Sequence, residues 1–249
     1  MNVATLCKAR RWNMTIWKKQ KIWDCGRSGD CREPRQAIGK CVPLTTNVYH
    51  FKIKCLVLKY PEDVCKLSRS WDYQAEIDYI VKSKYRNEFI RNLAISLEGN
   101  SLILFQFVEE HGKILYQLIN EEKKKRKVFF VFGGTDVEVR ESIRAITEKE
   151  NDAIIIASYG TFSTGINIRN LHNVIFASPS KSRVRNLQSI GRGLRKGDNK
   201  ETATLFDIAD DMRIGKHANF TLNHFIERVK IYDEEKFNYK FYNIELKNG

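Results

Sequence analysis

The chain of 249 residues is 42% hydrophobic, which is enough to bury the core of one large domain or two small ones. No stretch approaches the roughly 18 consecutive apolar residues of a spanning helix, and Lys8, Arg10 and Arg11 interrupt the start, so we expect neither a membrane segment nor a signal peptide. The formal charge of +13 favours a nucleic-acid partner, because neutralised phosphates release counterions, although charge alone leaves simple solubility as the alternative.

Residues 1–46 form a basic segment that contains Trp12, Trp17 and Trp23. Lysine and arginine outnumber the acids here by ten to three, and the apolar residues show neither helical nor strand periodicity. We therefore predict a poorly ordered segment, which limited proteolysis removes to leave a product that starts near Val48. The alternative is that the tryptophans stack on the bases of a single strand.

None of the six cysteines belongs to a C-x-x-C pair, so we expect reduced thiols and no metal site. A zinc knuckle formed by Cys25, Cys31, Cys41 and His50 is the alternative, but its spacings match no common pattern. Reduced thiols are typical of proteins inside the cell.

Over residues 47–249, short apolar runs alternate with helical patterns. Residues 51–58 predict a strand, and residues 71–81 and 89–97 predict two helices, the second of which ends at Gly99. Further strands are expected at 102–107, 128–132, 154–157, 174–177 and 203–208, with helices between them and the charged run 121–127 as the solvated end of one helix. This alternation predicts an α/β fold, a three-layer sandwich around a mainly parallel sheet.

Two loops after predicted strands carry polar groups, and the loops at the carboxyl ends of parallel strands are where ligands bind. Gly133 and Gly134 allow a close approach of the backbone to a phosphate, and Thr135 and Asp136 are able to cap the next helix. The alternative for the glycines is a tight turn.

The second loop, residues 157–167, is rich in hydroxyls and glycine. Hydroxyl groups such as those of Ser158 and Thr161 can contact the phosphate backbone of a nucleic acid. Such contacts position the strand without reading its sequence. A serine hydrolase needs G-x-S-x-G at this turn, and Ser163 does not have that spacing.

A third segment, Gln188–Arg195 (QSIGRGLR), places Arg192 and Arg195 three residues apart, on the same side of a helical turn. Such a pair of guanidinium groups stabilises the charge of a γ-phosphoryl group in transfer. The alternative is a basic, solvated helix end.

Together these segments resemble the motifs of superfamily 2 helicases. Gln188–Arg195 matches the Q-x-x-G-R-x-x-R pattern of motif VI, and the loop Ser158–Asn167 resembles motif V. Residues 102–108 and 133–140 resemble the segments that precede motif V. The run 157–197 is especially similar to the UvsW-type recombination and branch-migration helicases of T-even phages. About four fifths of the chain is thus identified as their C-terminal, second RecA-like domain, a P-loop NTPase fold that lacks its own P-loop.

In such helicases, two RecA-like domains hold ATP between them and carry nucleic acid across their tops. The resemblance implies that Arg192 and Arg195 are catalytic residues that contact the γ-phosphate. It implies four ATP-binding residues, namely Gln188, Gly191, Gly165 and Asn167, the last at a position where many relatives carry Asp. It also implies four contacts to nucleic acid, namely Gly133, Gly134, Ser158 and Thr161.

The ATP-binding motifs of such a motor do not occur in these 249 residues. The phosphate loop G-x-x-x-x-G-K-[ST] is absent, since Gly39-Lys40-Cys41 lacks the hydroxyl that holds magnesium. We expect no acidic pair after a buried strand, because the run 233–235 falls in the helical pattern 220–237 and predicts a solvated helix face. ATP and Mg²⁺ are therefore expected to bind only together with a partner N-terminal RecA-like domain, in cis or in trans.

The leading hypothesis is the C-terminal motor domain of an ATP-dependent DNA helicase of recombination or repair, which binds branched or single-stranded DNA without sequence preference. We expect it to be intracellular, in the host cytoplasm if a phage encodes it. The alternatives are a non-catalytic nucleic-acid-binding module and an inactive fragment of a split helicase gene.

Overall fold

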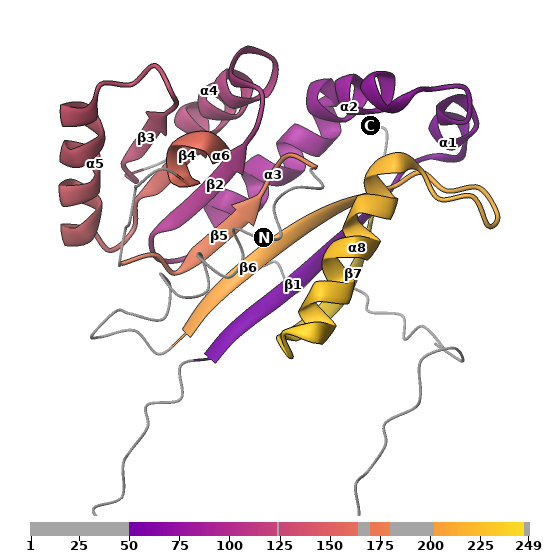
Figure 1. Cartoon of the computed structure of the whole chain (residues 1–249). Helices are drawn as coiled ribbons and strands as arrows, with labels where there is room; N and C mark the ends of the chain where they lie inside the picture. The colour runs from indigo at the N-terminus through magenta and orange to yellow at the C-terminus, as the bar shows by residue number, and fades with distance from the viewer. Residues whose placement is uncertain (1–49, 124, 164–169, 180–201, 247–249) are drawn as a thin grey trace, which may run out of the picture.

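The computed structural model describes residues 50–123, 125–163, 170–179 and 202–246. Their centre is a seven-stranded sheet in the order β3-β4-β2-β5-β6-β1-β7, and every neighbouring pair of strands is parallel (Figure 1). The predicted mainly parallel sheet is thus confirmed. The strands are β1 (His50–Lys59), β2 (Ser101–Phe105), β3 (Val128–Val131), β4 (Ile154–Ser158), β5 (Asn173–Phe176), β6 (Thr202–Asp211) and β7 (Asn238–Glu245).

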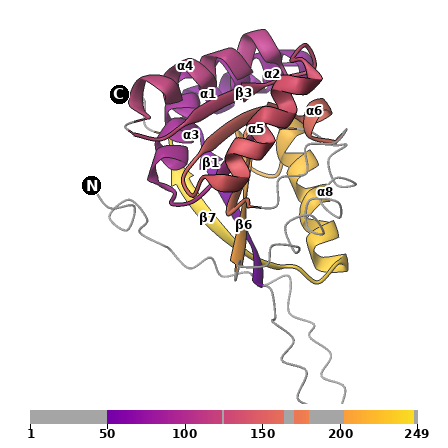
Figure 2. The same cartoon turned by 90° about the vertical axis from the view of Figure 1, so that its left-hand side faces the viewer.

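Helices cover both faces of the sheet, which confirms the predicted three layers (Figure 1, Figure 2). One face packs against α1 (Glu62–Ser68), α2 (Tyr73–Lys82), α3 (Lys84–Ser96) and α4 (Lys113–Glu122), the last preceded by the π-helix η2 (Val108–Gly112). The other face packs against α5 (Val137–Lys149), the short α6 (Tyr159–Ser163) and α8 (Phe220–Glu234).

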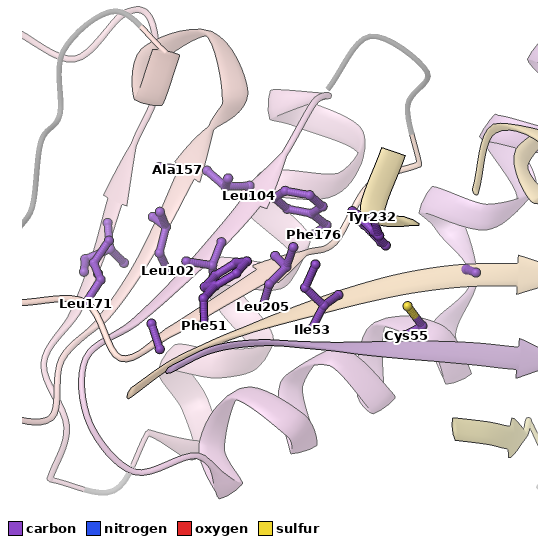
Figure 3. Close-up of a cluster of buried hydrophobic side chains, with 14 of the residues drawn as sticks. Phe51, Ile53, Cys55, Leu102, Leu104, Ala157, Leu171, Phe176, Leu205 and Tyr232 are labelled. Atoms are coloured by element: carbon purple, nitrogen blue, oxygen red, sulfur yellow. The ribbon is translucent and has the colours of Figure 1, made fainter. Parts of the chain in front are cut away.

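The alternation of side chains along β1 supplies both hydrophobic cores. Phe51, Ile53 and Cys55 point to the core beneath α8 (Figure 3), whereas Leu56 and Leu58 point to the core beneath α1 to α4. The inner strands β2 and β4 differ, because all five residues of each are buried between two layers of helices. Their continuous apolar runs are therefore what the sequence of an inner parallel strand should show.

Strand β7 has no counterpart among the predicted elements. It follows α8, which ends at Glu234, and pairs in parallel with β1 at the edge of the sheet. Tyr239, Tyr242 and Ile244 are half-buried, and the residues between them are exposed. An edge strand of this kind mixes polar and aromatic residues and offers no continuous apolar run.

The charged run 121–127 is not solvated throughout, because the Arg126 side chain is only 8% exposed. Its guanidinium donates to the carbonyls of Ala94, Leu97 and Gly99 at 2.8–3.1 Å and pairs with Asp152 at 2.9 Å. A cation at this position satisfies the free carbonyls at the C-terminus of α3 and interacts favourably with the helix dipole. The prediction of a solvated run is therefore wrong at Arg126.

Candidate nucleic-acid and nucleotide interface

Because the strands are parallel, their carboxyl ends all lie at one end of the sheet, the carboxyl edge (Figure 1). The loops that follow β3, β4, β5 and β6 leave from this edge, so polar residues from distant parts of the sequence lie along it. Ligands of open parallel sheets bind at such an edge.

The loop after β3 contains Gly133, which is exposed, and a Cβ there would meet no atom within 4 Å. Gly134 is more constrained, since a Cβ on it would lie 2.8 Å from the ring of Phe132. The Thr135 hydroxyl accepts a hydrogen bond from the Phe132 amide at 3.0 Å, and Asp136, at the N-cap of α5, makes no capping bond with its side chain. The two residues predicted to cap the helix therefore do not cap it, and Thr135 closes the loop instead.

The loop after β4 is organised by Ser158 and Thr161. Their hydroxyl oxygens lie 2.7 Å apart, and the Thr161 amide donates to the Ser158 hydroxyl at 3.4 Å. Both side chains are buried, so this pair holds the turn from the strand into α6. Gly160 lies between them and is exposed, and a Cβ there would meet no atom within 4 Å. A side chain at this position would therefore meet none of the described residues.

The end of β5 is held by a buried polar network that the sequence analysis did not predict. His111 Nδ1 lies 2.7 Å from the Ser178 hydroxyl, and Nε2 lies 3.2 Å from the side-chain oxygen of Asn87. Ser178 also accepts a bond from the Gln106 amide at 3.1 Å. The network joins the loops after β2 and β5 through the π-helix η2, and π-helical turns frequently occur at functional sites.

Residues 85–197, a range that contains every predicted site residue, match the family described as Helicase conserved C-terminal domain. The ATP-dependent DNA helicase uvsW of Enterobacteria phage T4 is 35% identical over a match that covers 89% of this chain and 49% of that protein. The crystal structure of T4 UvsW aligns with a TM-score of 0.71 at 37% identity, covering 79% of this chain and 42% of that chain. The chain carries the C-terminal domain of a UvsW-like superfamily 2 helicase.

The fold of this helicase domain recurs at much lower identity. The C-terminal domain of the DEAD-box protein Dbp5 matches with a TM-score of 0.50 at 12% identity, covering 79% of this chain and 91% of that chain, which shows the fold alone. The chain spans about half the length of its T4 relative. Because that match covers 89% of the chain, it includes part of the sequence before Val48.

The helicase domain carries an acidic pair, Asp210 and Asp211, at the end of the buried strand β6, so the expectation of no such pair is wrong. Asp210 accepts from Arg86 at 2.7 and 3.1 Å and from the Tyr60 hydroxyl at 2.9 Å. Asp211 is bound by Lys59 and Arg213. Burial alone would raise the pKa of Asp211, but the hydrogen bonds from Arg213 and Lys59 outweigh it and lower that pKa. Both carboxylates therefore serve ion pairs within the domain.

The run 205–211 (LFDIADD) is a signal that could have revealed this pair, because its acids end an apolar stretch. By contrast, Asp233, Glu234 and Glu235 are exposed at the end of α8, as predicted for a solvated helix face.

Several predicted groups lie outside the described ranges. These are the segment 1–46 and the residues Gly165, Asn167, Gln188, Gly191, Arg192 and Arg195. Three of the four proposed zinc ligands also lie there, while Cys55 and Cys65 are buried free thiols. Within the described ranges, no three His, Cys, Asp or Glu side chains are grouped to hold a metal ion, and no helix is both long and apolar enough to cross a membrane.

Proposed function

We propose that this chain supplies the second motor domain of an ATP-dependent DNA helicase that acts in recombination or repair. One observation carries the proposal: the chain is 35% identical to an ATP-dependent DNA helicase over a match that covers 89% of the chain. The position of the Ser158–Thr161 turn at the carboxyl edge of a parallel sheet supports it. The edge faces a first RecA-like domain, and the two domains together hold ATP and carry DNA.

ATP and Mg²⁺ are held mainly by the first domain. These 249 residues contain no phosphate loop, and the acidic pair of β6 is bound by basic side chains of its own domain. The second domain supplies Arg192 and Arg195 to the γ-phosphate, with Gln188, Gly191, Gly165 and Asn167 in the same cleft. A guanidinium placed on the transferring phosphoryl group stabilises its developing charge.

DNA contacts come from the loops after β3 and β4. Gly133 is exposed and a Cβ there would meet no atom within 4 Å, so a phosphate can approach the backbone of the loop after β3. Gly160, in the loop after β4, is also exposed. Gly134, Ser158 and Thr161 shape these loops from within. Contacts of this kind fix the position of a strand and do not read bases, so binding is independent of sequence and weakens as salt rises.

The test combines this chain with a separately produced first motor domain and measures ATP hydrolysis with and without DNA. We expect no hydrolysis above background by the chain alone and DNA-stimulated hydrolysis by the mixture or by a fusion of the two. Robust turnover by the chain alone contradicts the division of roles. A mixture that binds DNA and never hydrolyses ATP favours a non-catalytic binding module instead.

A further inference from the structure

A pocket of about 330 Å³ opens beside the carboxyl ends of β6 and β1, apart from the loops after β3 and β4. Its walls come from the turn that precedes α2, the loop between β6 and α8, and the first turn of α8. The residues that define its chemistry are Arg69, Trp71, Glu76, His217, Phe220 and Asn223. This volume is at the small end of ligand sites in proteins.

Two aromatic rings from distant parts of the sequence line this pocket. Trp71 is fixed from behind by Tyr79, whose ring centroid lies 4.8 Å away. Phe220 is 46% exposed and is supported edge-on by Tyr73 at 6.1 Å. Rings held in place while one surface stays open are typical of platforms on which the bases of a single strand stack.

The floor of the pocket excludes a phosphate and suits a hydrogen-bond donor. Glu76 is 1% exposed, and its Oε1 accepts bonds from Thr221, through the amide and the hydroxyl, and from the Asn219 side chain at 2.6–2.8 Å. Its Oε2 accepts a single bond, from the Phe220 amide at 3.0 Å, and a carboxylate oxygen has capacity for a second. A buried carboxylate repels an anion, whereas the N–H groups of a nucleobase can donate to it.

The rim of the pocket is basic. Arg69 lines the pocket and is exposed. Ile214 and His217 also line it, and the turn between them carries the exposed Lys216. Gly215 in this turn has a φ of 59°, which favours glycine and keeps the turn tight. Cations at the rim attract phosphates and the carboxylate at the floor repels them, so a nucleotide would bind with its phosphates outside the pocket and its base inside.

We propose that this pocket receives one unstacked base of the DNA strand that the helicase carries, an inference that rests on the proposed function. The β6 strand lies three positions from β4 in the sheet, which corresponds to about 14 Å at the usual strand spacing. A strand held by its phosphates at the β4 loop reaches the pocket within a few nucleotides. The pocket therefore adds a base contact to an edge that otherwise binds phosphates.

The experiment measures binding of the full chain to a single-stranded oligonucleotide of mixed sequence and to the same oligonucleotide with abasic sites. Phe220→Ala should weaken binding of the intact DNA by about tenfold and leave binding of the abasic DNA unchanged. Trp71→Phe keeps an aromatic surface and should stay within about twofold of the unsubstituted chain. The matched control is Ile226→Ala, which removes a comparably exposed side chain elsewhere on α8.

The inference is overturned if Phe220→Ala loses the same affinity for intact and abasic DNA, or loses none. In either case, DNA binding by the unsubstituted chain still supports the proposed function. Failure of the unsubstituted chain to bind either oligonucleotide overturns both. If Phe220→Ala leaves DNA binding unchanged but weakens association with a first motor domain, the pocket is a contact between domains, and the base-binding inference is wrong.

Discussion

Strand β6 carries a buried Arg–Asp–Tyr cluster on each of its two faces, and the two clusters differ in what they connect. Asp207 accepts two bonds from Arg228 at 2.9 Å and one from the Tyr232 hydroxyl at 2.7 Å, and both partners belong to α8. Asp210 makes the corresponding bonds to Arg86 of α3 and to Tyr60 after β1. One cluster fixes a single helix to the sheet, and the other joins three elements at its carboxyl edge.

The spacing of the two acids explains the arrangement. Residues three apart on a strand point to opposite faces, so one acid lies beneath α8 and the other beneath α3. The edge cluster is the less complete one, because Nη1 of the fully buried Arg86 has no hydrogen-bond partner among the described residues. Charged groups of the same kind thus hold a helix against the sheet in one place and join elements at the carboxyl edge of the sheet in the other.

The largest effect should come from a third kind of arginine, one that we propose to act in catalysis rather than in holding the fold together. In an assembled two-domain motor, we expect Arg195→Lys to lower ATP hydrolysis by about 10³-fold or more, because lysine lacks the planar fork that stabilises the γ-phosphoryl charge. Arg192→Lys should behave similarly, and the thermal midpoint and DNA affinity should not change. Lys196→Ala is the control and should keep its activity. Normal turnover by Arg195→Lys, measured as DNA-stimulated phosphate release, contradicts the assignment.

The two clusters themselves can be separated by Asp207→Asn and Asp210→Asn. Each substitution leaves a buried arginine without its counter-charge, so we expect each to lower the free energy of unfolding by about 3–5 kcal/mol. Hydrogen exchange should then distinguish them, because Asp207→Asn should expose amides of α8 and Asp210→Asn those of α3 and the end of β1. Identical exchange patterns in the two variants would show that the clusters form one cooperative unit.

Much of this architecture could be predicted from the sequence because inner parallel strands are buried on both faces. The apolar runs at 102–105 and 154–157 are uninterrupted for that reason, and the order of strands and helices then determines the layers. The hydroxyl-rich turn at Ser158 was predictable for a related reason, since it directly follows such a strand.

The remaining features depend on contacts that local sequence does not encode. Arg86 and Asp210 are 124 residues apart, and neither residue alone indicates that it is buried. Arg126 lies in a charged run and becomes a helix cap only because the end of α3 packs against it. The residues of β7 alternate between exposed and half-buried positions, a weaker pattern than that of an inner strand.

A smaller effect is expected from pH, through the tyrosines of the two clusters. Burial and the charge of Asp210 raise the pKa of Tyr60 well above its ordinary value of 10.0, and burial and Asp207 do the same for Tyr232. Above pH 10 the unfolded chain has therefore lost protons that the folded chain keeps, so stability falls as pH rises. Each tyrosine contributes about 1.4 kcal/mol per pH unit to this fall.

Urea denaturation between pH 9 and pH 11, roughly the range around the tyrosine pKa, measures this slope. Tyr60→Phe should remove the contribution of one tyrosine, so the free energy of unfolding should fall less steeply with pH. The variant also loses the hydrogen bond from Tyr60 to Asp210. The comparison between variant and unsubstituted chain cancels the contributions of other groups. A slope that Tyr60→Phe does not change would mean that the phenol titrates normally in the folded state.

The smallest effect should come from the turn after β4 at the carboxyl edge, which is held by hydroxyl groups and not by ion pairs. Thr161→Val keeps the shape of the side chain and removes the hydroxyl that bonds Ser158 at 2.7 Å. The loss of one such bond costs about 1 kcal/mol, so stability should fall slightly and DNA affinity by about fivefold as the turn becomes less well ordered. Thr161→Ser restores the hydroxyl and should recover both, because a serine hydroxyl can form the same bond to Ser158. If Thr161→Val loses stability but binds DNA as tightly as the unsubstituted chain, the β4 turn is structural, and the DNA contacts must be sought at Gly133 and in the pocket beside β6.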